Sequence, residues 1–156
     1  GRIINVLYLV LTGLLDIPVL YLSRYLVRNK SEYYRLLQHV RDTGEWEGWL
    51  LYILEAVEQT AKDGIDTVQQ IHQAMLDYKH RIRENFNFYS QDLINHLFNH
   101  PYTKIDFLMK TLNVSRPSAA KYLDELTEGG FLHKEKIGRN NYYINIALMN
   151  ILLPTD

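Results

Sequence analysis

The fold of the C-terminal part of this 156-residue chain is decided by the stretch Leu112-Asn-Val-Ser-Arg-Pro-Ser-Ala-Ala-Lys-Tyr-Leu-Asp-Glu-Leu-Thr-Glu-Gly-Gly130. Ser115 is a hydroxyl residue of the kind that caps a helix N-terminus, and Pro117 suits a first turn, where a missing N–H costs nothing. The small Ala119 permits a close crossing with a preceding helix. The glycine pair stops the helix, because glycine readily adopts the left-handed conformation. The stretch therefore predicts a short turn followed by a helix over residues 116–128.

The segments on either side of this stretch complete a pattern of three helices and a hairpin. Apolar periodicity predicts helices over residues 90–99 and 104–112 before it, and two β-prone segments, 131–136 and 141–145, follow it. A glycine-containing polar turn joins these two segments, which indicates a hairpin, and a last short helix is expected over 146–153. This order resembles the winged helix-turn-helix family. It predicts a mainly helical chain with a small β-hairpin.

The resemblance to winged helices implies a DNA-binding surface. In that family the third helix enters the major groove and the hairpin contacts the backbone. The residues expected to contact DNA are Arg116, Ser118, Lys121, Lys134, Lys136, Arg139 and Asn140. The segment from residue 90 to residue 156 nevertheless has seven basic and seven acidic residues, and winged helices also serve as protein-docking or dimerisation modules. DNA and a protein partner both remain open.

The first residues of the chain are apolar enough to be compared with a membrane span. Asp16 and Pro18 interrupt the apolar run over residues 3–15 well short of the roughly 20 residues that a span needs. Only one basic residue precedes the run, and no small-residue cleavage site follows it, so a signal peptide is also disfavoured. We interpret the segment as a buried helix over residues 2–14 and expect no membrane partner.

Three further helices are predicted before the winged helix. Two are short, over residues 18–27 and from an N-cap at Ser31 to about Gly44. A much longer one is expected over 45–83, because apolar residues recur along it about every 3.6 residues. Its stripe predicts packing against the winged helix or against a second copy, so a homodimer is a candidate assembly. Residues 85–89 break the pattern and divide the chain into domains 1–85 and 86–156.

The N-terminal part carries a second resemblance. The chain contains, in this order, Gly13-Leu-Leu-Asp-Ile-Pro-Val-Leu-Tyr-Leu-Ser-Arg-Tyr25, Tyr33-Tyr34 and Trp46-Glu-Gly-Trp49. This order and spacing are similar to the C-terminal half of a Fic domain. Some bacterial members of the Fic family continue into a C-terminal winged helix, so the resemblance covers essentially the whole chain. It implies that the intact protein transfers AMP from ATP, with magnesium, to a hydroxyl side chain of a target protein.

The catalytic motif of the Fic family, HPFxDGN, does not occur in this sequence. In the family the motif histidine is the general base and the acidic residue holds magnesium. We therefore expect this chain to have no catalytic residue, metal ligand or cofactor of its own. The resemblance makes Arg2, which matches the last arginine of the motif, and the pair Tyr33 and Tyr34 the nucleotide-binding candidates. Packing between helices is the alternative role for the two tyrosines.

Composition narrows the classes of function. Seventeen basic and eighteen acidic residues give a net charge of −1, so any DNA contact has to come from a local patch. The absence of cysteine excludes disulfides and favours a reducing, cytoplasmic compartment. His96 and His100 have the i,i+4 spacing of a zinc pair, but no third ligand is evident.

The rival to the Fic interpretation is a free-standing helical transcription regulator whose first 85 residues serve dimerisation.

Overall fold

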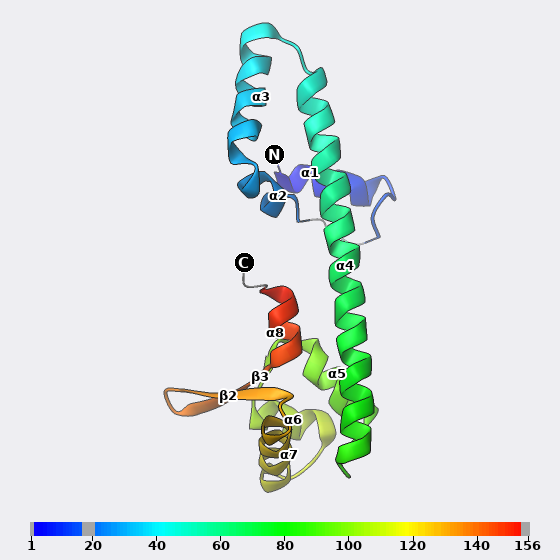
Figure 1. Cartoon of the computed structure of the whole chain (residues 1–156), viewed down its shortest axis with the longest axis vertical. Coiled ribbons are helices and arrows are strands. Elements are labelled where there is room, and N and C mark those ends of the chain that lie inside the picture. The colour runs from blue at the N-terminus through cyan, green and yellow to red at the C-terminus, as the bar shows by residue number, and fades with distance from the viewer. Residues whose placement is uncertain (1, 17–20, 154–156) are drawn as a thin grey trace. The chain divides into compact units, whose positions relative to one another are not determined.

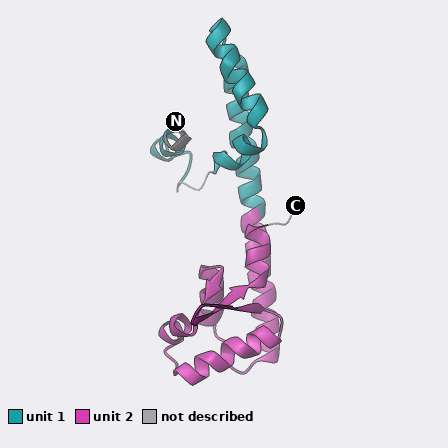
Figure 2. Cartoon of the chain, turned by 90° about the vertical axis from the view of Figure 1, so that its left-hand side faces the viewer, with its two compact units in different colours: residues 1–66 teal, residues 67–156 magenta. Residues whose placement is uncertain are grey.

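The computed structural model describes residues 2–16 and 21–153, except for the side chains of Arg2, Ile3 and Asn5. Its elements follow in the order α1 (Arg2–Leu11), α2 (Leu22–Arg28), α3 (Lys30–Thr43), α4 (Glu47–Asn85), α5 (Gln91–Asn99), β1 (Tyr102–Thr103), α6 (Ile105–Leu112), α7 (Arg116–Glu128), β2 (Leu132–Ile137), β3 (Asn140–Asn145) and α8 (Ile146–Leu152). The described residues are mainly helical and form one small antiparallel sheet, as predicted (Figure 1). Two compact units, residues 1–66 and 67–156, are distinguished by colour in Figure 2.

Apolar side chains form two clusters in the N-terminal unit, which contains residues 1–66. Leu26, Leu36 and Tyr52 are buried together and join α2, α3 and the first half of α4. Leu22 and Ala56 form the second cluster, against which side chains of α1 pack. Helices α2, α3 and α4 thus bury apolar side chains, which is the usual source of helix stability in a globular protein. Helix α1 packs Val6 and Leu9 against the second cluster, but Ile4, Leu7, Tyr8 and Leu11 are more than half exposed, so the prediction of a buried helix there is wrong.

Several helix boundaries in this unit differ from the predicted ones: α1 ends at Leu11 rather than at residue 14, and α4 begins at Glu47 rather than at residue 45. Helix α3 begins at Lys30 with Asn29 at the N-cap, so Ser31 lies inside the helix and the N-cap predicted for it is wrong. Its predicted end is confirmed, since Gly44 follows the last turn with a φ of 75°. Helix α2 begins at Leu22, whereas the sequence predicts a start at residue 18; residues 17–20 lie outside the described part.

Helix α4 contributes residues to both units. It runs as one helix from Glu47 to Asn85. Within residues 67–156, Tyr78 and Ile82 are buried in the core, whereas Val68 is 66% exposed. Only the last turns of the predicted stripe therefore pack in this unit. The domain boundary that the sequence places after residue 85 remains a prediction.

The C-terminal unit, residues 67–156, contains the three helices and the hairpin that the sequence predicts. Helices α5, α6 and α7 agree with the predicted helices to within one residue at each end. Strands β2 and β3 pair from Leu132 with Asn145 to Ile137 with Asn140. Strand β1 was not predicted; it pairs with β3 and completes a sheet of order β1-β3-β2. A strand of two residues is too short to show an alternating pattern.

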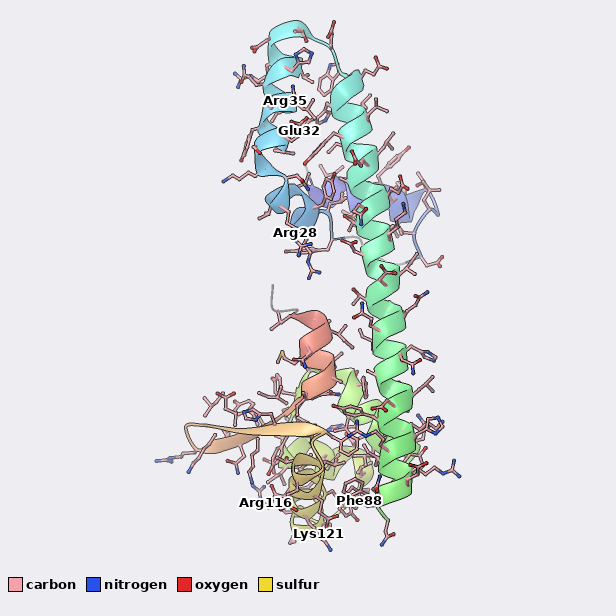
Figure 3. The ribbon with its side chains drawn as sticks, viewed as in Figure 1. Arg28, Glu32, Arg35, Phe88, Arg116 and Lys121 are labelled. Carbon is pink, nitrogen blue, oxygen red and sulfur yellow. The ribbon has the colours of Figure 1, made fainter. Side chains whose placement is uncertain are left out.

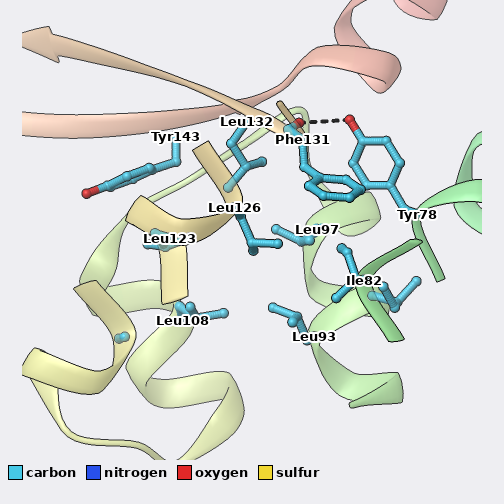
Figure 4. Close-up of a cluster of buried hydrophobic side chains, with 12 residues drawn as sticks. Tyr78, Ile82, Leu93, Leu97, Leu108, Leu123, Leu126, Phe131, Leu132 and Tyr143 are labelled. Carbon is cyan, nitrogen blue, oxygen red and sulfur yellow. Dashed lines mark hydrogen bonds between the residues drawn. The ribbon is translucent and has the colours of Figure 1, made fainter. Parts of the chain in front are cut away.

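The core of this unit lies between α4, α5, α6, α7 and the first residues of β2, as Figure 4 shows. Leu93, Leu108 and Leu123 are completely buried and meet there. Tyr78 adds two hydrogen bonds to this core. Its hydroxyl donates one of 2.8 Å to the carbonyl oxygen of Phe131 and accepts one of 3.3 Å from the N–H of Ala147. The last turns of α4 are thereby joined to the start of the hairpin and to α8.

Candidate nucleic-acid interface

Helix α7, the predicted recognition helix, begins with a side-chain cap. The Ser115 hydroxyl accepts a hydrogen bond of 3.3 Å from the backbone N–H of Ser118, and the two serine hydroxyls lie 2.9 Å apart. Arg116 and Lys121 lie on the exposed side of this helix (Figure 3). Ser118 is half-buried and takes part in the cap, so its hydroxyl has a structural partner as well as the DNA-binding role predicted for it.

Both cations of α7 are paired with carboxylates. Arg116 donates to Asp106, which lies in the first turn of α6, and the Lys121 ammonium lies 3.7 Å from Glu125, one turn along α7. Both pairs are largely exposed. Exposed ion pairs contribute about 0–1 kcal/mol, so neither pair prevents its cation from moving to a phosphate.

The third paired cation joins the hairpin to α7. The Lys134 ammonium on β2 donates a hydrogen bond of 2.7 Å to Asp124, and the hydroxyl of Tyr143 on β3 donates one of 3.0 Å to the same carboxylate oxygen. Hydrogen bonding to Asp124 raises the pKa of Lys134, and burial raises the pKa of Tyr143. Lys134 therefore joins the hairpin to α7, and its charge is paired with that of an acidic residue of α7.

The tip of the hairpin has the remaining predicted cations. Lys136 and Arg139 are exposed, and within residues 2–16 and 21–153 neither has a carboxylate at ion-pair distance. Asn140 is exposed beside them, and Gly138 makes the turn with a φ of 62°. The tip extends away from helices α6 and α7 (Figure 1). Among the predicted DNA contacts, Lys136 and Arg139 are therefore the cations that a phosphate could bind without displacing a carboxylate of the protein.

Lys104 is a cation near this surface that the sequence analysis did not name. It is the residue between β1 and α6, and its ammonium lies 4.3 Å from the centre of the Tyr142 ring on β3. It too has no carboxylate at ion-pair distance among the described residues. No sequence signal singles it out, because its neighbourhood depends on the pairing of β1 with β3.

The nucleotide-binding candidates lie in the N-terminal unit. Tyr33 is half-buried, with its ring 5.0 Å from that of Trp49 and 5.2 Å from that of Tyr34. Tyr34 is exposed, and the side chain of Arg2 lies outside the described residues. The ring contacts of Tyr33 are those of a packing residue. A nucleotide role for Arg2, Tyr33 and Tyr34 remains a prediction.

His96 holds three elements of the C-terminal unit together. Its Nε2 lies 2.6 Å from the Thr103 hydroxyl of β1, and its Nδ1 lies 2.9 Å from the Thr111 hydroxyl of α6. Both ring nitrogens therefore have partners within the protein, which does not suit the zinc ligand considered above. Burial lowers the pKa of His96, and the neighbouring His100 lowers it further.

The lowered pKa of His96 predicts a pH-dependent stability. A histidine titrates near 6.5 in the unfolded chain, so below that pH the unfolded chain binds more protons than the folded one. The contribution of His96 is complete above the unfolded pKa and is lost as the pH falls through the window below it. Urea unfolding is expected to give a lower free energy of unfolding at about pH 5.5 than at about pH 7.5.

Two histidine variants make this measurement specific. His96→Gln should reduce the difference between the free energies of unfolding measured at the two pH values, because the titrating group is removed. His133→Gln changes an exposed histidine of β2 and should leave the difference as in the wild type. Equal pH dependence in the wild type and His96→Gln would contradict the assignment.

No helix in the described part of the chain combines the length and apolar character needed to cross a membrane. Residues 75–148 match the model of a family described as protein adenylyltransferase SoFic-like, C-terminal domain. The matched segment runs from the last turns of α4 into α8 and so includes the whole sheet and the helices α5, α6 and α7. The match covers 74 of the 156 residues and supports the interpretation of residues 75–148 as a SoFic-like C-terminal domain, the kind of domain that the resemblance to Fic proteins implies.

Proposed function

We propose that the intact protein is a protein adenylyltransferase and that the C-terminal unit of this chain is a winged helix that binds the backbone of double-stranded DNA. The hairpin tip carries the DNA part of the proposal. Lys136 and Arg139 are exposed, unpaired cations within the described residues, and Asn140 beside them can donate hydrogen bonds. Cations and amides at such positions contact phosphates and sugars, which orient a protein on the duplex without reading its sequence.

Helix α7 offers two further cations for phosphate contacts, but its acidic residues should make DNA binding weak. Arg116 and Lys121 can exchange their carboxylate partners for phosphates, since exposed ion pairs are weak. Asp124, Glu125 and Glu128 lie on the same helix and would repel the DNA backbone. We therefore expect contacts that are mostly to phosphates, with little sequence preference unless a homodimer doubles the interface.

Removal of the hairpin cations should weaken DNA binding and flatten its salt dependence. Cations at phosphates act mainly by releasing counterions, and the logarithm of the binding constant falls with the logarithm of salt concentration by about 0.9 per contact. Lys136→Ala/Arg139→Ala should reduce that slope by about two units, and Lys121→Ala by about one. The measurement is titration of a fluorescently labelled duplex at several salt concentrations.

Neutralising the carboxylate that pairs with a cation provides a second test, in which the affinity for DNA should rise instead of fall. Glu125→Gln frees Lys121 and should raise affinity about two- to fivefold, within the range that an exposed ion pair allows. Glu128→Gln makes the same charge change on the same helix at a residue without an ion pair among the described residues, so it should have a smaller effect. Equal gains in both variants would show that overall charge, rather than release of Lys121, is responsible.

Protein docking is the second candidate function. It is favoured by the pairing of Arg116, Lys121 and Lys134 with acidic residues, which lowers the positive potential of the surface. If the wild type and the hairpin variant bind the duplex equally poorly at low salt, DNA binding is wrong and docking takes its place.

The adenylyltransferase proposal has its own test. It rests on the family of residues 75–148, and it assigns ATP, magnesium and a target protein to the intact protein rather than to the residues described here. Reading the coding sequence upstream of Gly1 is the direct experiment. A segment of the HPFxDGN type supports the proposal, and its absence leaves a free-standing regulator as the better interpretation.

A further inference from the structure

The ammonium of Lys104 lies over two aromatic rings at the junction of β1, α6 and β3, and a third ring packs against one of them. Its ammonium lies 4.3 Å from the centre of the Tyr142 ring and 5.7 Å from that of Phe107, and the rings of Tyr102 and Tyr142 are 5.5 Å apart. We call Tyr102, Phe107 and Tyr142 the aromatic patch. Tyr102 and Phe107 are 42% and 41% exposed, so both rings are accessible at the surface.

The charge of Lys104 differs from that of the paired cations on α7 and β2. An aromatic ring attracts the ammonium and limits its motion, but it does not neutralise the positive charge as a carboxylate does. Arg116, Lys121 and Lys134 each face a carboxylate, whereas Lys104 faces only rings among the described residues. Lys104 is thus an oriented cation whose charge remains available to an anion.

Contacts connect Lys104 to both parts of the proposed DNA surface. On one side, Asp106 in the first turn of α6 pairs with Arg116 at the start of α7. On the other side, Tyr142 belongs to β3, the strand that leads back from the hairpin tip at Asn140. Lys104, Arg116 and Arg139 are far apart in the sequence, and the packing of α6 on α7 together with the pairing of β1 with β3 links the elements that carry them.

We propose that Lys104 binds a phosphate of the DNA backbone between the contacts made by α7 and those made by the hairpin tip. The aromatic patch holds the ammonium in place, and the exposed rings of Tyr102 and Phe107 can pack against the adjacent deoxyribose. The proposal rests on the proposed DNA-binding function and adds to it a residue, its ligand chemistry and its place on the surface.

The experiment uses the full chain and the same labelled duplex, with salt slope and affinity as the two measurements. Lys104→Ala should reduce the slope by about one unit, because one phosphate contact is lost. Lys110→Ala is the matched control: it removes a lysine, also without an ion pair among the described residues, from the last turn of α6, the helix that Lys104 precedes, and it should leave the slope unchanged. Thermal unfolding of both variants shows whether each is folded at the assay temperature.

Variants of Tyr142 separate the orientation of Lys104 from its charge. Tyr142→Leu keeps the lysine but removes the ring beneath it, so affinity should fall about twofold to fivefold, the scale of one exposed cation–π contact. Its slope should stay close to that of the wild type, because no charge is lost. Tyr142→Phe keeps the ring and should bind as the wild type does.

The outcomes distinguish this inference from the function on which it rests. If the duplex binds and Lys136→Ala/Arg139→Ala lowers the slope while Lys104→Ala behaves as Lys110→Ala, the DNA function stands and the Lys104 contact is wrong. Failure of the wild type to bind any duplex at low salt overturns both. If a single strand binds more tightly than the duplex and Tyr102→Leu abolishes that preference, the patch stacks on bases and the phosphate assignment is wrong.

Discussion

Leu123→Ala is expected to lower the free energy of unfolding of the C-terminal unit by about 2–5 kcal/mol. Leu123 has no exposed surface, and with Leu126 it lies on the face of α7 that packs in the core, where Leu108 of α6 is also completely buried (Figure 4). Truncation removes buried methyl groups and leaves a cavity that the surrounding side chains fill only in part. A loss of this size is comparable with the whole stability of many domains, which is about 5–15 kcal/mol.

The measurement is urea unfolding followed by circular dichroism, which reports the loss of helix. Leu153→Ala is the matched control, because it removes the same atoms from a leucine that is 68% exposed. Its effect should stay within about 0.5 kcal/mol, as for most surface substitutions. A Leu123→Ala variant as stable as Leu153→Ala would show that α7 does not pack in the core as described.

Asn145→Ala should also destabilise the C-terminal unit, by about 2–4 kcal/mol when the loss of a helix cap and of a buried hydrogen bond are combined. Asn145 is 1% exposed at the end of β3. Its amide nitrogen donates a hydrogen bond of 2.9 Å to the carbonyl oxygen of Leu97, and its amide oxygen accepts one of 3.0 Å from the N–H of Leu148. Alanine leaves a buried acceptor on α5 and a donor at the start of α8 without partners.

Asn141→Ala provides the control for this prediction. Asn141 lies on the same strand but is only half-buried, and its side chain has no hydrogen bond among the described residues. Its replacement should change the free energy of unfolding by less than about 1 kcal/mol. Amide hydrogen exchange adds a local measurement: protection of α8 should fall in Asn145→Ala and remain in Asn141→Ala. Unchanged protection of α8 would contradict the cap.

Local chemistry explains why the elements of the C-terminal unit could be predicted. Ser115 accepts the hydrogen bond of an N-cap, and Gly130 takes a positive φ of 78° directly after α7. Both effects depend on the residue and its nearest neighbours in sequence, so they can be recognised without a structure. The hairpin could be predicted for the same reason, since Gly138 takes the positive φ that its turn requires. The N-cap predicted at Ser31 is wrong because Asn29, two residues earlier, takes that place.

The electrostatic properties of the candidate site could not be predicted in the same way. The sequence shows seven basic and seven acidic residues from residue 90 onward, but it does not show which of them meet. Arg116 and Asp106 are ten residues apart and belong to different helices, and Lys134 and Asp124 are also ten apart, on a strand and a helix. Their pairing requires the crossing of α6 with α7 and the packing of the hairpin on α7. Charges that look equivalent in the sequence therefore differ in the structure, where Lys136 and Arg139 alone among the predicted cations remain unpaired in the described part.

The sequence by itself determined the helical class of this chain, the turn before α7, the hairpin and the relation to Fic proteins, because caps, periodicity, turn residues and ordered motifs are local properties. The tertiary structure decided the rest. It added β1, which exists only through its pairing with β3; it buried Asn145 and placed the half-buried His96 between elements; and it brought Lys104 beside Tyr142. These features depend on contacts between residues distant in sequence, and such contacts form only when the apolar faces of several elements pack around one core.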